Sequence, residues 1–354
     1  MDTKNILVLF GGASPEHEIS LQSAAAVIPF LSRHTVVPVY ITKEGKWLLY
    51  DGKLDNIQGI DWEKYGTSAV LSPDRVNRGL LRVVGDKIKI IPIDVVFPIL
   101  HGPNGEDGTI QGLCELADLP YVGCGVTASS AAMDKGIAKL IAKGLKIPQA
   151  EFLVFDEIYL RENKKEALRK IGLKIKYPCF VKPACGGSSI GVSKANNRKE
   201  LIAAIETALK FHHRLVFEKA VDGREVEVGI LGTGSGAKAS VVGEILADGD
   251  FYDFEAKYES PASQTVVPAD ISKEISEKIQ AYALEIFRSI DGRGLSRADF
   301  FITSEGNVLF NEINTVPGFT AISMYAKMWE AMGISRQSLV EGLVNLAVPE
   351  NINE

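Results

Sequence analysis

The sequence lacks the features that mark several common classes of protein. Its four cysteines form no C-x-x-C pair and have no histidines at metal-ligand spacing, which argues against a disulfide framework and favours reduced thiols. No apolar run approaches the length of a membrane span, and the first residues show no signal-peptide pattern, so we expect a soluble, cytoplasmic protein without membrane contact. The formal net charge is −6, so no global positive field would recruit nucleic acid.

What is present is an ordinary globular composition, with 46% apolar and 24% charged residues in 354 positions. This length predicts two or three domains with sizeable cores. The first third alternates strands with helices: Asn5–Phe10, a helix from Glu18 to Leu31, Val36–Ile41 and Val95–Leu100. That alternation predicts the βαβ units of an open parallel sheet, and therefore an α/β fold class.

The rest of the chain changes character near residues 125 and 221. Residues 51–88 are polar, and we interpret them as an insertion without chemistry. A helix is expected over 128–143, and further elements over Glu151–Phe155, Cys179–Lys182, Asn197–Phe211 and Arg214–Glu218. After Gly223 the pattern becomes strand-rich, with helices near 272–289 and 336–347. We therefore predict three domains, over 1–125, 126–220 and 221–354.

A predicted hairpin over 297–315 carries an unusual set of polar side chains. Two apolar runs flank a turn at Ser304-Glu305-Gly306, so Asp299 should lie opposite position 311 or 312. Glu312 and Asn314 are two residues apart and project from the same face. These oxygen donors favour a hard cation such as Mg²⁺ or Mn²⁺, with Arg297 beside them. The alternative is a solvated hairpin face with ordinary capping residues.

Two glycine-rich loops, at 186–192 and 11–14, each follow a predicted strand. Gly186-Gly187-Ser188-Ser189-Ile190-Gly191-Val192 can close backbone amides around an anion, but Val192 stands where a P-loop needs lysine. Lys182, in the preceding strand, can supply the charge instead, although a flexible turn explains the loop equally well. Gly11-Gly12-Ala13-Ser14 is no dinucleotide fingerprint. Glu16 and Glu18, which follow it, are most simply interpreted as dipole-stabilising residues of a first helical turn.

Two further segments suggest ligand contacts. His101 follows a strand at the edge where open α/β sheets bind ligands, whereas Glu106 and Asp107 are interpreted as helix caps. The segment 217–225 joins the second and third predicted domains. Such a hinge can hold a planar base against the backbone atoms of residues 219 and 221.

Together these motifs resemble the ATP-grasp superfamily, and within it the D-alanine–D-alanine ligases. The resemblance covers nearly the whole chain. It rests on Leu9-Phe10-Gly11-Gly12-x-Ser14-x-Glu16-x-Glu18-Ile19-Ser20, His101-Gly102-x-x-Gly105-Glu106-Asp107-Gly108, Met133-Asp134-Lys135-x-x-x-Lys139, Val181-Lys182-Pro183-x-x-Gly187-Ser188-Ser189-x-Gly191-Val192, Tyr252-Asp253-Phe254-x-Ala256-Lys257-Tyr258, Arg297-x-Asp299, and Asn311-Glu312-Ile313-Asn314-Thr315-x-Pro317-Gly318-Phe319-Thr320.

The resemblance implies a fold and a set of roles. The fold is an ATP-grasp, α/β with an α+β C-terminal part, in which an open parallel-sheet domain precedes a small central and a larger C-terminal domain. ATP would contact Lys139, Lys182, Ser188, Ser189, Glu218, Lys219, Val221, Glu225, Lys257 and Asn311. Two Mg²⁺ ions, or Mn²⁺, would bind Asp299, Glu312 and Asn314. D-Alanine would meet Glu18, His101, Ser323 and Met324, and catalysis would use Glu18, Ser188, Tyr258, Arg297 and Gly318.

The implied reaction is the two-step formation of D-alanyl-D-alanine for peptidoglycan precursors, through a D-alanyl phosphate. The polar run Phe251–Gln264 is interpreted as a lid that keeps water from this intermediate. Tyr258 and the apolar Met324 favour D-alanine as second substrate, and D-serine or D-lactate is the alternative. The family further implies a homodimer that acts on small molecules. Cys185, beside the phosphate loop, is either a small turn residue, which we favour, or an oxidant-sensitive thiol.

Overall fold

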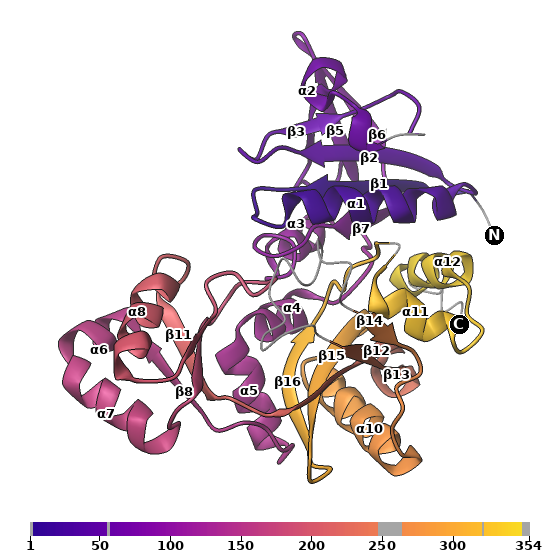
Figure 1. Ribbon diagram of the computed structural model, residues 1–354. Helices are drawn as coiled ribbons and strands as arrows, with labels where there is room; N and C mark the ends of the chain where they lie inside the picture. Colours follow the sequence, from indigo (N-terminus) through magenta and orange to yellow (C-terminus); the bar gives the residue numbers. More distant parts are fainter. Residues whose placement is uncertain (1–2, 55–56, 247–263, 321, 349–354) are drawn as a thin grey trace.

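The computed structural model describes residues 3–54, 57–246, 264–320 and 322–348, which form three lobes around a central region (Figure 1). The N-terminal lobe is built on a seven-stranded sheet in the order β6-β5-β4-β3-β2-β1-β7. Its centre is parallel, with β1 (Asn5–Gly11) between β2 (Thr35–Ile41) and β7 (Val95–Ile99). The predicted strands and the open α/β sheet are therefore confirmed in this lobe.

Residues 51–88 do more than form an insertion, because they supply β4, β5 and the start of β6 to this sheet. The chain continues through β3 (Trp47–Leu49), η2 (Ile57–Gly59), α2 (Trp62–Tyr65), β4 (Thr67–Leu71), β5 (Gly79–Val84) and β6 (Lys87–Pro92). These four strands pair antiparallel. Antiparallel strands can leave one face in solvent, so their sequences mix polar and apolar residues and give a weaker signal than the buried parallel strands.

Helices cover both faces of the parallel centre, and alternate residues of β1 point to opposite cores. Ile6, Val8 and Phe10 pack in a core with α1 (His17–Val27), η1 (Ile28–Leu31) and α12 (Arg336–Ala347). Leu7 and Leu9 face a second core with α3 (Thr109–Leu116). The helix α12, near the end of the described residues, thus completes the core of the N-terminal lobe.

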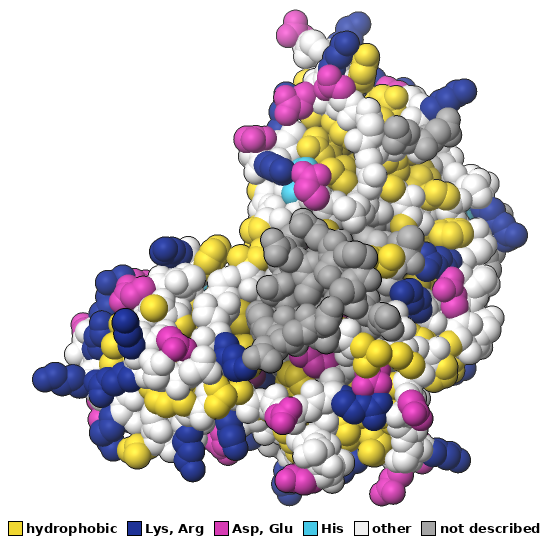
Figure 2. Space-filling view, viewed as in Figure 1, with side chains coloured by type: hydrophobic (Ala, Val, Ile, Leu, Met, Phe, Trp, Pro, Cys, Tyr) yellow, Lys and Arg dark blue, Asp and Glu magenta, His cyan; other side chains and the backbone are white. Residues whose placement is uncertain are grey.

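The central lobe is a four-stranded antiparallel sheet in the order β10-β9-β11-β8. Its strands are β8 (Phe152–Asp156), β9 (Cys179–Pro183), β10 (Ser193–Ala195) and β11 (Arg214–Lys219), and its helices are α6 (Glu157–Glu162), α7 (Lys164–Lys174) and α8 (Arg198–Ala208). Figure 2 shows many Lys and Arg side chains on this lobe, with acidic side chains among them. Several form exposed ion pairs within a helix, as Arg161 does with Glu157.

The C-terminal lobe holds a five-stranded sheet in the order β14-β13-β12-β15-β16. The strands are β12 (Gly223–Thr233), β13 (Lys238–Leu246), β14 (Gln264–Val266), β15 (Arg293–Thr303) and β16 (Val308–Asn314), with η3 (Gly234–Gly236), α10 (Lys273–Ser289) and α11 (Met324–Glu330). This antiparallel sheet with helices packed on it agrees with the α+β character predicted for the C-terminal part.

Two helices that we predicted to belong to the central domain pack instead against the C-terminal lobe. We assigned α4 (Val126–Met133) and α5 (Lys135–Gly144) to the central domain, but their small residues lie in the C-terminal core. Ala138 and Ala142 of α5 join a cluster with Phe300 and Phe310 of the β15–β16 hairpin. Because alanine side chains are small, they let α5 pack closely against the sheet of the C-terminal lobe. By packing, the central lobe begins near residue 151.

Candidate active site

The three lobes enclose a cleft of about 1340 Å³. Its walls hold most of the residues that the sequence singled out, namely His101, Lys182, Ser188, Ser189, Glu218, Lys219, Val221, Glu225, Arg297, Asn311, Glu312, Asn314, Gly318, Ser323 and Met324. Glu18 and Lys139 do not line it, and Asp299 lies just behind its wall. Lys257, Tyr258 and most of the predicted lid lie outside the described residues.

The glycine-serine loop after β9 forms one edge of the cleft. Ser188 and Ser189 both adopt left-handed backbone angles, at φ of 50° and 58°. Such angles are uncommon outside glycine and concentrate at functional sites. The carbonyl of Gly186 accepts a hydrogen bond of 2.6 Å from the ammonium of Lys135, which lies at the start of α5. The loop is thus tied to a cation, as a phosphate-binding loop requires.

Three charged side chains meet at the back of the cleft. The ammonium of Lys182 lies 3.2 Å from Oε2 of Glu218 and 3.5 Å from Oδ1 of Asn311. Lys139 approaches the same Glu218 oxygen at 3.3 Å but from behind the wall, where its side chain is only 1% exposed. Burial opposes ionisation of Lys182, yet Glu218 and Glu312 outweigh it and raise its pKa. Of the two lysines, Lys182 alone faces the cleft.

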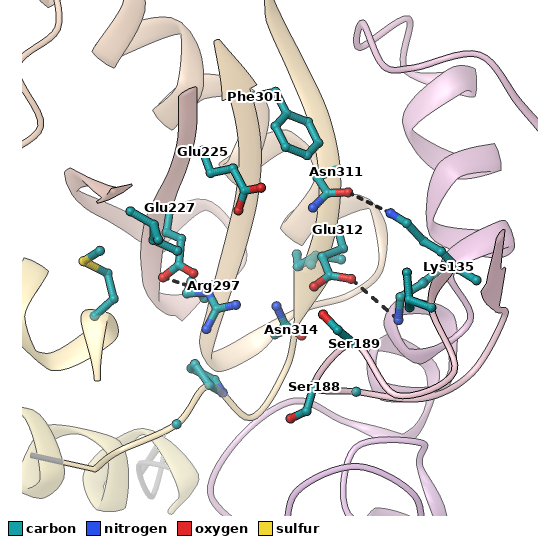
Figure 3. Close-up of a pocket in the computed structure, with 18 of the residues that line it drawn as sticks. Lys135, Ser188, Ser189, Glu225, Glu227, Arg297, Phe301, Asn311, Glu312 and Asn314 are labelled. Atoms are coloured by element: carbon teal, nitrogen blue, oxygen red, sulfur yellow. Dashed lines mark hydrogen bonds and ion pairs between the residues drawn. The ribbon is translucent and has the colours of Figure 1, made fainter. Parts of the chain in front are cut away.

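The β15–β16 hairpin has the register that the sequence predicted. Asp299 lies opposite Glu312, and Arg297 lies opposite Asn314. Figure 3 shows Arg297, Asn311, Glu312 and Asn314 projecting into one region of the cleft, with Lys135 across from Glu312. The Lys135 ammonium lies 3.6 Å from that carboxylate. The hairpin therefore brings acidic and amide oxygens together beside a lysine from the opposite wall.

Arg297 is held by carboxylates on two neighbouring strands. Its guanidinium donates to both oxygens of Asp299, at 2.7 and 2.6 Å, and lies 3.2 Å from Glu227 of β12. Burial opposes its charge, but Asp299 and Glu227 outweigh burial and raise the pKa of Arg297 well above its usual value. Asn314 also donates to Asp299, at 3.2 Å. Arg297 is thus a fixed, permanent cation at the cleft wall.

Glu18, to which the resemblance assigns substrate binding and catalysis, does not line the cleft. Glu18 points into solvent, where its side chain is 64% exposed and pairs with Lys43 at 2.9 Å. Glu16, two residues earlier, is buried in the cleft wall and accepts a hydrogen bond from Ser188 Oγ. A Cβ at Gly102 or Gly187 would clash with the Glu16 carboxylate, which explains why glycines stand there.

Glu16 belongs to a buried polar network that includes His101. The ring of His101 contacts Ser23 Oγ at 2.9 Å through Nε2 and Glu106 at 3.4 Å through Nδ1. Burial favours neutral imidazole, yet Glu106 and Glu16 outweigh it and raise the pKa of His101. Burial and the Glu106 carboxylate raise the pKa of Glu16. Such a network can position and neutralise the charged end of a small substrate.

Glu106 is therefore more than the helix cap that we predicted. Asp107 does act at that turn, because its carboxylate accepts from the backbone N–H groups of Asn104 and Thr109. Glu106 instead lines the cleft beside His101. The two neighbouring carboxylates thus have different tasks, which their sequence positions do not distinguish.

Gly318, Thr320, Ile322, Ser323 and Met324 line one end of the cleft. Ser323 precedes α11 and exchanges a hydrogen bond of 2.8 Å with Thr320. Met324 packs with Ile245 and Met328 while its side chain still borders the cleft. This end combines a hydroxyl and exposed backbone groups with an apolar surface, an environment suited to a small amino acid.

Cys185 behaves as a structural thiol. Burial and the nearby Asp134 carboxylate raise its pKa to about 11, so the thiol stays protonated at neutral pH. A protonated thiol is a poor nucleophile and a poor target for oxidants. This agrees with the interpretation, favoured above, of a small residue in a tight turn.

Comparisons with known proteins point to one family. Residues 5–124 match the family model described as D-ala D-ala ligase N-terminus, and residues 141–345 match the one described as D-ala D-ala ligase C-terminus. The chain is 43% identical to the D-alanine--D-alanine ligase of Caldicellulosiruptor bescii, covering 99% of this chain and 97% of that protein. It is 46% identical to the same enzyme of Acetivibrio thermocellus, with 98% and 96% covered.

Solved structures give the same result. The VanG D-Ala:D-Ser ligase from Enterococcus faecalis superposes with a TM-score of 0.88 at 37% identity, covering 98% of this chain and 100% of that one. The D-alanine-D-alanine ligase from Coxiella burnetii gives a TM-score of 0.82 at 32% identity, with 98% and 94% covered.

Proposed function

Because this chain belongs to the D-alanine–D-alanine ligase family, we propose a chemical role for each group in its cleft. The protein is an ATP-grasp ligase that uses ATP to join two D-alanines for peptidoglycan synthesis. Its substrates are small molecules.

The first step transfers a phosphoryl group. The carboxylate of one D-alanine attacks the γ-phosphorus of ATP, which gives D-alanyl phosphate and ADP. Lys135 and Lys182 hold the phosphates from two sides, with the loop of Ser188 and Ser189 over them. Lys135 takes the role that we predicted for Lys139, because its ammonium reaches the cleft. Phosphoryl transfer depends mainly on such positioning and charge neutralisation.

The nucleoside lies at the junction of β11 and β12. Glu218, Lys219 and Val221 border the adenine, and Glu225 is placed to accept hydrogen bonds from the ribose hydroxyls. Asn311 lies beside Lys182 near the phosphates. Lys257, which falls outside the described residues, remains proposed as a further phosphate contact.

The oxygen donors of the hairpin suit a hard divalent cation, although both oxygens of Asp299 accept hydrogen bonds from Arg297 here and would have to turn toward the cleft to bind it. Asp299 and Glu312 are cross-strand partners, and Asn314 contributes a carboxamide. No cluster of three or more His, Cys, Asp or Glu side chains around a common centre occurs in the described part of the chain, so phosphate oxygens of ATP have to complete the coordination. We propose two Mg²⁺ ions here, with Mn²⁺ as an alternative. Bound there, they neutralise charge on the transferring phosphoryl group.

The second step forms the amide. The amine of the second D-alanine attacks the acyl carbon and expels phosphate, and Arg297 with the Gly318 amide stabilises the oxyanion. Glu16 replaces Glu18 as the proposed partner of the first ammonium, beside His101. Ser323 and Met324 flank the carboxylate of the second D-alanine. Tyr258, which lies outside the described residues, remains the proposed hydrogen-bond partner of Ser188.

The observation that carries this proposal is the meeting of two lysines, an acidic hairpin and a buried carboxylate in one cleft. Lys135 and Lys182 supply phosphate contacts, Glu312 faces Lys135, and Glu16 lies beyond the serine loop. Phosphate-binding, metal-binding and ammonium-binding groups are thus within reach of one small substrate. This is the arrangement that an ATP-dependent amide ligase needs.

We expect D-alanine as the second substrate. Met324 offers no group to a hydroxyl, although one structural relative is named a D-Ala:D-Ser ligase. A competition assay with Mg-ATP, D-alanine and either D-serine or D-lactate should give D-alanyl-D-alanine as the main product. A majority of mixed dipeptide or ester would contradict the D-alanine preference. Absence of both ADP and dipeptide would refute the ligase assignment.

We propose a homodimer formed through the N-terminal lobe. Val70, Val83, Ile88 and Ile90 share one face of the paired strands β4, β5 and β6 and are all exposed. Apolar side chains gathered on an exposed face are typical of an interaction site. The partner's matching face would cover them.

Sedimentation velocity tests this proposal. Ile88→Lys should convert the dimer to monomer at micromolar protein, because two buried charges would face each other across the interface. Ile158→Lys is the matched control, since Ile158 on α6 is exposed to the same degree, 68% against 67%. A monomeric wild-type protein, or a dimer that survives Ile88→Lys, would rule this interface out.

We also propose a cytoplasmic location, where ATP is available. None of the helices in the described ranges combines the length and apolar character that a bilayer crossing requires. Cys114, Cys124, Cys179 and Cys185 are all free thiols, as expected in a reducing compartment.

A further inference from the structure

Lys139 lies buried behind the cleft wall with a single carboxylate partner. It belongs to α5, its side chain is 1% exposed, and its ammonium lies 3.3 Å from Oε2 of Glu218. Among the described residues, Glu218 is the one carboxylate within ion-pair distance of that ammonium. A buried ammonium is costly unless it is paired and hydrogen-bonded. The ion pair with Glu218 offsets part of that cost, although the Lys139 ammonium has no hydrogen-bond partner among the described residues.

The same Glu218 oxygen is also the partner of Lys182. The Lys182 ammonium lies 3.2 Å from Oε2 of Glu218 and, unlike Lys139, borders the cleft. Two lysines therefore share one carboxylate. Burial lowers the pKa of Lys139, and the Glu218 carboxylate opposes that shift. With both lysines protonated, the triad of Lys139, Lys182 and Glu218 has a net charge of +1. Burial would raise the pKa of Glu218, but the two lysines outweigh it and hold that pKa below its usual value.

We propose that Lys139 is a positioning residue for ATP, which acts by sharing the Glu218 carboxylate so that Lys182 remains available to the triphosphate. In a one-to-one pair, Lys182 and Glu218 would neutralise each other, and a phosphate would have to break that pair. With Lys139 behind it, Glu218 is already neutralised, so Lys182 can turn its charge toward the cleft. This inference rests on the proposed function, because it assumes that the triphosphate lies beside Lys182.

Calorimetric titration of the wild-type protein and two variants with two ligands tests it. The ligands are AMP-PNP with Mg²⁺, which carries a triphosphate, and adenosine, which carries none. In Lys139→Met the dissociation constant for AMP-PNP should rise about tenfold, the effect of losing one partly screened charge contact. Adenosine binding should change less than twofold. The control Lys143→Met changes an exposed lysine one turn further along α5 and should change neither.

A double-mutant cycle separates this role from a general structural one. In a Glu218→Gln background no carboxylate remains to be shared, so adding Lys139→Met should leave the ratio of AMP-PNP to adenosine affinity unchanged. In the double variant Lys139 and its carboxylate partner are both absent, while Lys182 loses Glu218 but still borders the cleft beside Asn311, so this variant shows the effect of Lys139 without the shared carboxylate.

The outcomes are distinct. An unchanged affinity ratio in Lys139→Met, or equal loss of adenosine and AMP-PNP binding, would overturn the role of Lys139. A loss of the same size in both the wild-type and the Glu218→Gln backgrounds would also overturn it. Failure of the wild-type protein to bind AMP-PNP would instead refute the proposed function of the cleft.

Discussion

Glu312→Gln should lower the rate of ADP release by roughly 10³-fold while the protein stays folded. Glu312 projects into the cleft from β16, opposite Asp299, and no hydrophobic core depends on it. If its carboxylate binds the divalent ion, the amide removes the strongest ligand on that strand. Loss of metal-assisted charge neutralisation corresponds to several kcal/mol, hence the size of the effect.

A coupled assay for ADP measures the rate, and the paramagnetic signal of Mn²⁺ measures metal binding separately. The second measurement matters because Glu312 also lies 3.6 Å from Lys135, so activity alone would not distinguish a lost metal from a displaced lysine. Glu305→Gln is the matched control, since Glu305 is an exposed carboxylate at the turn of the same hairpin. Unchanged Mn²⁺ affinity in Glu312→Gln would refute the metal assignment.

Glu16→Gln should lower kcat/KM for the first D-alanine by about 10²- to 10³-fold, whereas Glu18→Gln should change it less than twofold. Glu16 is 6% exposed, so an ammonium bound to it is shielded from water, and removing the charge leaves that ammonium unpaired. Glu18 lies in solvent with Lys43, where an ion pair contributes little.

Steady-state rates at varied D-alanine give the result, with AMP-PNP affinity as the check on the neighbouring phosphate loop. That check is needed because Glu16 accepts a hydrogen bond from Ser188. A variant that loses AMP-PNP binding and D-alanine turnover together would indicate a loop defect instead of a lost substrate contact. A large effect of Glu18→Gln would restore the prediction made from the sequence.

The hairpin was predictable because its information is local. Side chains alternate along a strand, so the spacing of Glu312 and Asn314 fixes their shared face, and the short turn fixes Asp299 opposite Glu312. The buried strands of the N-terminal sheet were predictable for a similar reason, since burial on both faces gives continuous apolar runs.

Glu18 and Lys139, which we predicted to lie in the cleft, show where reasoning from sequence fails. Glu16 is the N-cap residue before α1 and Glu18 lies in the first turn of that helix, and their side chains point in different directions. The sequence does not say which of them faces the cleft, because both are acidic residues at the same helix N-terminus. Lys135 and Lys139 differ by four positions and share a face, separated by about 6 Å along the axis. Only the position of α5 against the sheets decides that Lys135 reaches the cleft.

The roles of Glu106 and Glu227 needed the tertiary fold as well. Glu106 meets His101 across a tight loop, and Glu227 meets Arg297 across neighbouring strands. From the sequence alone, Glu106 is explained as a helix cap and Glu227 as an ordinary strand residue. Neither contact follows from the period of a helix or a strand, so neither leaves a local pattern in the sequence.

The packing of α12 against β1 has a consequence for how the chain is made. β1, with Ile6 and Val8, leaves the ribosome long before α12, with Leu339 and Leu343, and its core lacks that helix until then. The core of the N-terminal lobe is thus completed only after the residues of the central and C-terminal lobes have been synthesised. A premature stop before α12 would leave this apolar face of the N-terminal sheet uncovered.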